Sequence, residues 1–440
     1  RDSGSYGHRI VDKVRGATYR LQPHANSAQG QETTGLTAFH SDGFEVGGAQ
    51  DYNLNNNNHV AWMWDAGEAT TTIAAGGSNS SAYDQSDTWS NYLTTEISGS
   101  AGVDNPTQAF DGVLGNTSST SAGSSNTGTK GGLVWEPTNP YPVNNTIRVY
   151  GGSATDVYEV DFGSGYTNAT SVGSGEWATI YQGSGNLVRI RSKDPSSGNA
   201  SRIGAIEIDG KQLVDSGVTV TNVPEVECKV RANQAAGFSI VKVDNPTNTE
   251  TRVHGLSKAP EFFICKSTGS ADSWHTYWAE LGKDYYINIY PIGAKASSDQ
   301  FGSQEPNSVS FYVKPNTGSG ANKSGGMIYY LWHSVEGFSK FSSYTGTGGD
   351  VFVYCGFRPR LITFKNADQS NNWLTYDTAR DPSNVANRSI QWDNSYNDSG
   401  ITNDDIDILS NGFVIKNTRN DMTNNGSKIL FGAWAEHPFA

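Results

Sequence analysis

One short pattern recurs three times along this chain and constrains its fold more than any other feature. In each copy a Phe opens an apolar run, a turn rich in Asn, Gly or Ser follows, and a Trp ends a second apolar run. The Phe and Trp are 20 residues apart in the first copy and 21 in the other two. The pairs are Phe44 and Trp64, Phe311 and Trp332, and Phe413 and Trp434. Such a repeat predicts one structural unit per copy.

The second and third copies also match in their front halves. A Pro, a Lys, a Trp and a Tyr recur with identical spacing, because Pro260, Lys266, Trp274 and Tyr277 match Pro359, Lys365, Trp373 and Tyr376. The first copy shows the back half alone, in which Asp12 to Arg15 resembles Asp377 to Arg380. A sandwich without its first strands exposes unpaired edges and an apolar face. We therefore expect residues before Arg1, another chain or the next repeat to complete it.

The composition favours short strands joined by turns. Hydrophobic residues make up 35% of the 440 positions and charged residues 17%, while aromatic residues reach 11% and there are 50 Gly. Gly, Asn and Ser are turn residues, aromatic residues favour strands, and disorder would need fewer aromatics and more charge. We find no long stretch of helical periodicity. The prediction is an all-β chain of tandem antiparallel β-sandwiches.

A stretch between the first and second copies lacks the repeat and forms a separate module. Residues 68–99 are rich in Thr, Ser, Gly and Asp, as in a linker. From 100 to 215, short runs alternate apolar and polar residues between turns, which predicts an inserted sandwich or jelly roll. The predicted domains are a partial repeat at 1–67, the linker at 68–99, the insert at 100–215, a connector at 216–236, and repeats at 237–337 and 338–440.

The repeated aromatic residues are predicted to be core rather than binding platforms. The Phe opens one strand and the Trp closes its hairpin partner, so both rings are expected to bury about 150–250 Å² each in one sandwich core. Trp62 lies on the same face as Trp64 because side chains alternate along a strand. The predicted repeat core is Phe44, Trp62, Trp64, Trp274, Phe311, Trp332, Trp373, Phe413 and Trp434.

Binding is the natural use of turns on a β scaffold, and a few residues are candidates for it. Trp135 and Tyr141 of the insert can stack on sugar rings, and Asn56 and Asn57 can bond hydroxyl groups, although their Asn run is also typical of a hairpin tip. Asp111 can either ligate a structural Ca²⁺ or cap a turn. No other cofactor or metal is expected.

Catalytic chemistry finds little support in the sequence. Glu336 and Glu436, or the cluster of Asp404, Asp405 and Asp407, could form a carboxylate pair of the glycosidase type. None of these acids has a counterpart in every copy, and the Asp cluster lies in a polar turn. We find no GxSxG, HExxH, phosphate-binding loop or EF-hand pattern. The expectation is that the chain is not an enzyme, and no residue is assigned as catalytic.

The net charge and the cysteines argue against several further classes of protein and of site. The net charge of −13 and the absence of a basic stripe argue against nucleic acid as a partner. No apolar run reaches the roughly 20 residues that a membrane span requires, so no membrane insertion is expected. Cys228, Cys265 and Cys355 are widely spaced and odd in number, which indicates neither a disulfide framework nor a zinc site.

Several ordered blocks resemble a domain of virion structural proteins from marine cyanophages and related phages. The matching blocks are Ser41–Phe44, Val60–Gly67, Gly237–Lys242, Val253–Pro260, Val335–Phe341, Ser342–Gly346, Gly356–Pro359 and Ala435–Phe439. The insert separately resembles galactose-binding-like jelly rolls through Asn105–Pro106 and Ala109–Gly112, although it lacks the Trp that follows in that family. The first resemblance implies concanavalin-like or lectin-like sandwiches on the surface or tail of a virion, outside the cell.

The expected function is that of a tail fibre, spike or other appendage that binds host-surface glycans without catalysis. Its expected partners are other virion proteins, further copies of itself in a homo-oligomer, and a host glycan. The alternatives are a purely structural decoration or connector protein of the virion, a secreted bacterial lectin, and a polysaccharide depolymerase.

Overall fold

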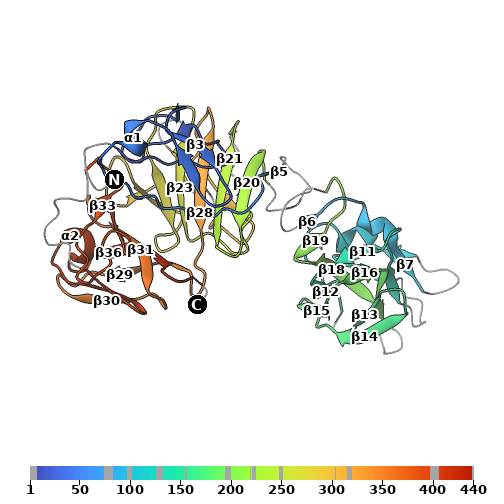
Figure 1. Cartoon of the computed structure of the whole chain (residues 1–440). Helices are drawn as coiled ribbons and strands as arrows, with labels where there is room; N and C mark the ends of the chain where they lie inside the picture. Colours follow the sequence, from blue (N-terminus) through green and yellow to red (C-terminus); the bar gives the residue numbers. More distant parts are fainter. Residues whose placement is uncertain are drawn as a thin grey trace. The chain divides into compact units, whose positions relative to one another are not determined.

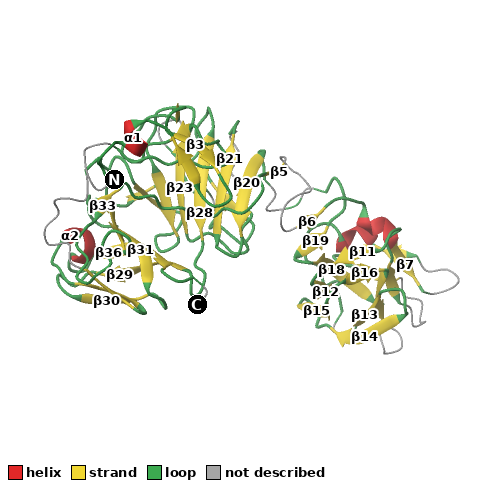
Figure 2. Cartoon of the chain, viewed as in Figure 1, coloured by secondary structure: helices red, strands yellow, loops and turns green. Residues whose placement is uncertain are grey.

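The structure, a computed structural model, separates into two compact units. Unit 1 consists of residues 1–75 and 224–440, and unit 2 consists of residues 76–223. The described residues are 7–73, 83–96, 102–124, 132–153, 156–193, 200–218, 220, 224–246, 251–302, 304–314, 320–396 and 406–438. Strands dominate both units (Figure 2), so the all-β prediction is confirmed.

Unit 1 holds all three copies of the repeat. The first copy supplies β1 (Tyr19–Arg20), β2 (Gly30–Gln31), β3 (Leu36–Phe39), β4 (Phe44–Val46), α1 (Gln50–Asn53) and β5 (Thr71–Ile73). The second supplies β20 (Cys228–Asn233), β21 (Phe238–Val243), β22 (Thr251–Val253), β23 (Phe262–Ser267), β24 (His275–Trp278), β25 (Tyr285–Asn288), β26 (Ala296–Ser297), β27 (Ser310–Tyr312) and β28 (Met327–Trp332). The third supplies β29 (Ser339–Thr345), β30 (Val351–Tyr354), β31 (Pro359–Asn366), β32 (Leu374–Asp377), β33 (Ile390–Gln391), β34 (Ile406–Leu409), β35 (Gly412–Ile415), α2 (Asn420–Thr423) and β36 (Lys428–Ala435).

Each complete copy contains a large sheet and a small one. The second copy orders its large sheet β26-β25-β24-β23-β28-β21-β20-β5, and the third orders its own β33-β32-β31-β36-β29. The small sheets are β22-β27 and β30-β35-β34. The central strands therefore match one to one, with β21, β28, β23 and β24 equivalent to β29, β36, β31 and β32. The first three strands of each set are labelled in Figure 1.

The two large sheets pack against each other, and each also packs against its own small sheet. Along β28, Ile328, Tyr330 and Trp332 belong to a core shared with the third copy. The residues between them, such as Tyr329 and Leu331, belong to a separate core with β27. Because successive side chains point to opposite faces, a strand that is buried on both faces becomes continuously apolar. The uninterrupted apolar runs of the repeat are thereby explained.

This arrangement separates the two aromatic residues of the repeated pattern. Phe311 and Phe413 lie in the cores inside their own copies, whereas Trp332 and Trp434 lie in the shared core. Trp64 of the first copy joins them there, with ring centroids 6.1 Å from Trp332 and 5.4 Å from Trp434. The expectation that Phe and Trp share one core is therefore wrong, because each large sheet has two buried faces.

An aspartate–arginine ion pair in the first copy and a second such pair in the third copy lie at the contacts between copies. Asp12 accepts hydrogen bonds from the backbone N–H (2.8 Å) and Nε (2.5 Å) of Arg15, and from the Tyr330 hydroxyl (2.7 Å) of the second copy. In the third copy, Asp377 bonds Arg380 in the same way and also accepts from the indole Nε1 of Trp62 (3.2 Å). The resemblance of the two sequence motifs therefore reflects one repeated structural contact.

The first copy is less buried than the other two. Trp62 and Trp64 are half-buried against the shared core, but Phe44 is 36% exposed, unlike the fully buried Phe311 and Phe413. Its placement in the predicted core is therefore corrected. The physical reason is that the described part of this copy has no counterpart of the strands β23 and β31 that cover the equivalent Phe residues.

Unit 2 is a β-sandwich with one aromatic-rich core. Its elements are β6 (Tyr83–Asp84), η1 (Trp89–Tyr92), β7 (Leu93–Thr95), β8 (Val103–Asp104), η2 (Pro106–Ala109), β9 (Ala122–Ser124), β10 (Leu133–Trp135), β11 (Tyr141–Val143), β12 (Thr146–Gly151), β13 (Val157–Asp161), β14 (Tyr166–Ser171), β15 (Trp177–Gln182), β16 (Gly185–Leu187), β17 (Arg189–Lys193), β18 (Arg202–Ile208) and β19 (Lys211–Leu213). One sheet runs β14-β13-β17-β10-β7 and another β15-β12-β18-β19-β6.

Two predicted boundaries differ from those of the structure. Residues 83–96, expected in the linker, pair with the sheets of unit 2 through β6 and β7 and place Trp89 and Leu93 in its core. The expected connector contains β20, which pairs with β21 and with β5. Residues 74–82 and 97–101 lie outside the described residues. Short strands with polar residues resemble linkers in composition, and their sheet partners are distant in sequence.

Candidate functional site

A polar hollow of about 510 Å³ lies where the second and third copies meet in unit 1. Glu261 and Glu280 of the second copy line one part of it, and residues 354–357 of the third copy line another. The connecting segment from Ser334 to Ser342 completes the lining. The site therefore depends on both repeats, which the shared core holds together.

Serines of the connecting segment hold two of the three glutamates in place. Glu261 accepts hydrogen bonds from both the backbone N–H (2.7 Å) and the hydroxyl of Ser334. Glu280 accepts from the hydroxyls of Ser342 (3.2 Å) and Ser343 (2.9 Å). Glu336 is exposed and bonds no residue in the described part of the chain. The hollow thus presents ordered carboxylate oxygens as hydrogen-bond acceptors.

Two aromatic side chains are exposed on the strand that borders this hollow. Phe352 is 50% exposed and Tyr354 is 58% exposed, although both are large aromatic residues of β30. They are two residues apart, so they lie on the same face of the strand at about 7 Å spacing. Lys340 donates a hydrogen bond to the Tyr354 carbonyl (2.9 Å), and its Nζ lies 5.4 Å from the Tyr354 ring centroid.

The second copy shows that the fold does not require aromatic residues at these positions. Its strand β22 pairs with β27 as β30 pairs with β35, which makes Thr251 and Val253 the counterparts of Phe352 and Tyr354. Val253 is buried, and Thr251 accepts a backbone hydrogen bond from Glu225. The exposed aromatic pair is therefore present in the third copy and absent from the second.

The chemistry of this surface suits a flat polyhydroxylated ligand. Aromatic rings pack against apolar C–H faces, and a carboxylate oxygen accepts more than one hydroxyl hydrogen bond. Cys355 also lines the hollow, but it is a buried free thiol, and burial raises its pKa to about 12. Since the thiolate is the nucleophilic form, Cys355 is a structural residue.

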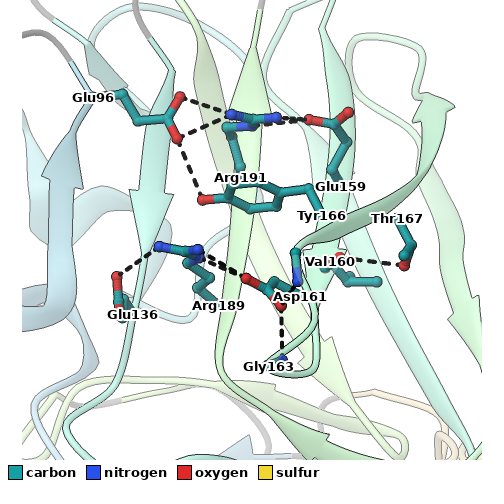
Figure 3. Close-up of polar contacts among 11 residues, drawn as sticks. Glu96, Glu136, Glu159, Val160, Asp161, Gly163, Tyr166, Thr167, Arg189 and Arg191 are labelled. Carbon is teal, nitrogen blue, oxygen red and sulfur yellow. Dashed lines mark hydrogen bonds and ion pairs between the residues drawn. The ribbon is translucent and has the colours of Figure 1, made fainter.

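A second charged surface lies on the five-stranded sheet of unit 2. Arg191 contacts Glu159 (Nε–Oε2, 2.8 Å) and Glu96 (3.0 Å), and Arg189 contacts Asp161 (2.9 Å) (Figure 3). The Tyr166 ring lies 3.8 Å from the guanidinium carbon of Arg191.

These charges are largely satisfied by one another. Burial alone would raise the pKa of Asp161, but the backbone N–H of Gly163 and the Arg189 guanidinium outweigh it and hold the pKa below its ordinary value. The sequence produces this ladder because charged residues alternate with buried Ile190 and Ser192 along β17. The paired side chains are 3–38% exposed and satisfy one another, so the ladder is best understood as a structural ion-pair network on this face of the sheet.

The two aromatic sugar contacts predicted in the insert pack with its core. Trp135 is fully buried, and its Nε1 donates to the Trp89 carbonyl (3.2 Å). Tyr141 packs against Trp89 with ring centroids 5.6 Å apart, and its hydroxyl donates to the Asp84 carboxylate. Trp135 cannot stack on a ligand, so its assignment is corrected, whereas Tyr141 is half-buried and its assignment stays a prediction. The strand pattern alone does not show which face is buried.

The asparagine candidates occupy a turn. Asn56 is exposed and adopts a left-handed φ of 63°, whereas Asn57 is half-buried. Asn tolerates this backbone region better than most residues. The structure therefore places them at a loop tip.

The candidate Ca²⁺ ligand caps a turn. The Asp111 carboxylate accepts a hydrogen bond from the backbone N–H of Val113 (2.8 Å), and burial raises its pKa. No group of three or more His, Cys, Asp or Glu side chains in the described ranges is arranged to hold a metal ion. In these ranges the structure therefore shows no set of ligands for the predicted calcium site.

Of the predicted catalytic carboxylates, the structure describes Glu336, Glu436 and Asp407. Glu336 lines the hollow, whereas Glu436 forms an ion pair with Arg358 (2.7 Å). Asp407 pairs with Lys416 (3.3 Å), and Asp404 and Asp405 lie outside the described residues.

Sequence reasoning missed Phe352 and Tyr354. In the run Val351–Tyr354 every residue is apolar or aromatic, so periodicity does not indicate which face is exposed. Aligning the small sheets of the two complete copies would have shown that the third copy alone has aromatic residues there.

Comparison with known proteins assigns the chain to a family. A family profile described as "Domain of unknown function (DUF7483)" matches residues 1–92 and 162–438. The searches of curated proteins and of solved structures returned no match. No helix in the described part of the chain is long and apolar enough to cross a membrane. Because the matched residues make up well over half of its length, the chain belongs to the DUF7483 family.

Proposed function

We propose that this protein is a non-catalytic structural component of a bacteriophage particle, such as a tail fibre or spike, that binds host-surface glycans. The resemblance of its repeat to virion proteins of marine cyanophages motivates the setting. The observation that carries the binding role is the exposed pair of Phe352 and Tyr354 beside the carboxylate-lined hollow.

The proposed mode of binding follows from the geometry of that surface. Successive sugar rings stack their C–H faces on Phe352 and Tyr354, which are about 7 Å apart along one strand. Hydroxyl groups of the same glycan donate to Glu336 and to the free lone pairs of Glu280. A single site of this kind is weak, and copies presented together on one particle raise the overall affinity by about 10²–10⁴.

The test is glycan binding by the whole chain. The protein is applied to an array of host envelope polysaccharides and compared with the double variant Phe352→Ala/Tyr354→Ala. We expect the double variant to lose at least tenfold in affinity. The matched control is Tyr396→Ala, because Tyr396 is another highly exposed aromatic residue of the same copy.

Three outcomes would contradict the proposal. The wild-type chain could bind none of the glycans, or bind them equally well without the two rings, or release a reducing end from them. The first would favour a role in contacts with other virion proteins, the second would move the site elsewhere, and the third would indicate a depolymerase.

A further inference from the structure

The three copies of unit 1 close into a ring around their shared core. The Trp residues that end the repeated pattern, Trp64, Trp332 and Trp434, contact one another pairwise, with ring centroids 6.1, 5.4 and 6.3 Å apart. Each copy therefore contacts both of the others. Equivalent units joined head to tail form a ring when the last unit returns to the first, so unit 1 has three junctions between copies.

One hydrogen bond recurs at the first two junctions. The indole Nε1 of Trp274 in the second copy donates to the Gln22 carbonyl of the first copy at 3.0 Å. The indole Nε1 of Trp373 in the third copy donates to the Asn288 carbonyl of the second copy at 2.9 Å. The two Trp residues are equivalent in the repeat, so each junction uses the same donor.

At the third junction a histidine takes the place of the tryptophan. His8 lies four residues before Asp12, as Trp373 lies four residues before Asp377, and the two segments match in sequence. The His8 ring donates a hydrogen bond to the backbone carbonyl of Gln391 in the third copy. The contact between the third copy and the first therefore repeats the contacts at the other two junctions with a different side chain.

The acceptor carbonyls of the complete copies occupy equivalent positions as well. Asn288 pairs with His275, and Gln391 pairs with Leu374. In both cases the pairing partner is the residue that directly follows the junction Trp of that copy. The hydrogen bond from His8 thus reaches the carbonyl that the repeat predicts.

The histidine differs from the two tryptophans in that it can take up a proton. An indole N–H is a donor at every pH, whereas an imidazole becomes positively charged in acid. The Nε2 of His8 is inaccessible to solvent and has no hydrogen-bond partner in the described part of the chain, so the donor to Gln391 is Nδ1. A proton added at Nε2 would place a charge at a buried atom.

The surroundings of His8 oppose that charge. Burial, together with nearby positive charges that include His24 and Arg9, holds the pKa of His8 below its ordinary value. The ring centroids of His8 and His24 are 6.3 Å apart. The acids of this region are engaged elsewhere, because Asp51 forms an ion pair with Arg9 and Glu32 forms one with Arg20.

We propose that the hydrogen bond from His8 to Gln391 is an acid-sensitive latch, which holds the first copy against the third while His8 is neutral and opens when His8 is protonated. The other two junctions, whose donors are Trp274 and Trp373, stay closed under the same conditions. The hollow described above is formed by the second and third copies, so opening of the latch leaves it in place.

The direction of the effect follows from proton uptake. In the open state His8 is solvated and binds a proton near its ordinary pKa of 6.5, whereas in the closed state it stays neutral to a much lower pH. The open state therefore binds more protons, and acid favours it. If the open state alone is protonated, its population rises about 25-fold between pH 7 and pH 5.

Hydrogen-exchange mass spectrometry of the whole chain at pH 7 and pH 5 tests the latch, after correction for the intrinsic pH dependence of amide exchange. The amides of Ile10 and Leu21, which bond each other's carbonyls, report the first copy. The amide of Ile289, which donates to the Trp274 carbonyl at 2.9 Å, reports the second. From pH 7 to pH 5 we expect opening to increase at least tenfold in the first copy and less than threefold at Ile289.

Three variants assign the response to one side chain. His8→Trp gives the first copy the donor of the other two copies, and His8→Gln supplies an amide N–H that does not titrate. Both should show less than a threefold increase in opening. His24→Gln is the matched control, because it removes the neighbouring histidine and keeps the latch, and it should retain at least a tenfold increase.

Four results would overturn the proposed latch. They are no acceleration in the first copy of the wild type, an equal acceleration at Ile289, a response that persists in both His8 variants, and loss of the response in His24→Gln. The last result would assign the proton uptake to His24. If both His8 variants are already open at pH 7, the wild type and His24→Gln still decide the question.

Discussion

The buried carboxylate of Asp12 should anchor the first copy to the second. It accepts hydrogen bonds from the backbone N–H of Val14 (3.0 Å), from Arg15 and from the Tyr330 hydroxyl. The side chain of Arg15 is 1% exposed. In Asp12→Ala, the guanidinium loses its counter-charge while it remains buried, which costs about 3–5 kcal/mol.

This cost should appear first as local opening of the first copy. The amides of Ile10 and Leu21 bond each other's carbonyls at 3.0 and 2.9 Å, and they report whether this segment is docked. Since about 1.4 kcal/mol corresponds to a factor of ten, we expect their hydrogen exchange to accelerate by roughly two to three and a half orders of magnitude. Hydrogen-exchange mass spectrometry on the whole chain measures this directly.

Two further variants make the prediction specific. Asp377→Ala breaks the equivalent contact with Arg380 and should accelerate exchange in the third copy, at Trp392, whose backbone N–H donates to the Trp373 carbonyl at 3.2 Å. Asp12→Ala combined with Arg15→Met removes the unpaired charge and should recover part of the loss. Acceleration below tenfold in Asp12→Ala, or no recovery in the double variant, would refute the reasoning.

Two other predictions concern stability. His254 is buried, its Nδ1 accepts from the Leu256 N–H and its Nε2 bonds the Asn307 carbonyl, and burial lowers its pKa to about 4. Because this histidine binds a proton near pH 6.5 in the unfolded chain and only near pH 4 in the folded chain, about 3 kcal/mol of stability should be lost as pH falls through that window. The free energy of unfolding in urea should therefore depend less steeply on pH in His254→Gln than in the wild type. An equal pH dependence in the two proteins would contradict this prediction. Trp135→Ala should lower the free energy of unfolding of unit 2 by about 3–5 kcal/mol and leave amide hydrogen exchange in unit 1 unchanged. Faster exchange at the Ile10 amide would show that the stabilities of the two units are coupled.

The repeat, the all-β class and the burial of the repeated aromatic residues in the second and third copies follow from the sequence by itself. Spacing and alternation are local properties, and they place Trp332 and Trp434 on buried strands without knowledge of any partner strand. The likeness of Asp12–Arg15 to Asp377–Arg380 was also visible in the sequence. The sequence did not show that both motifs make contacts between copies.

Only the tertiary structure decided which face of each strand meets which neighbour. A continuous apolar run is compatible with a strand that is buried on one face or on both faces. Only the packing of the two large sheets against each other shows that both faces are buried. Phe44, Phe352 and Tyr354 have the same chemistry as core residues such as Phe413. They are exposed because no strand in the described part of the chain covers them, and the presence of a covering strand depends on contacts distant in sequence.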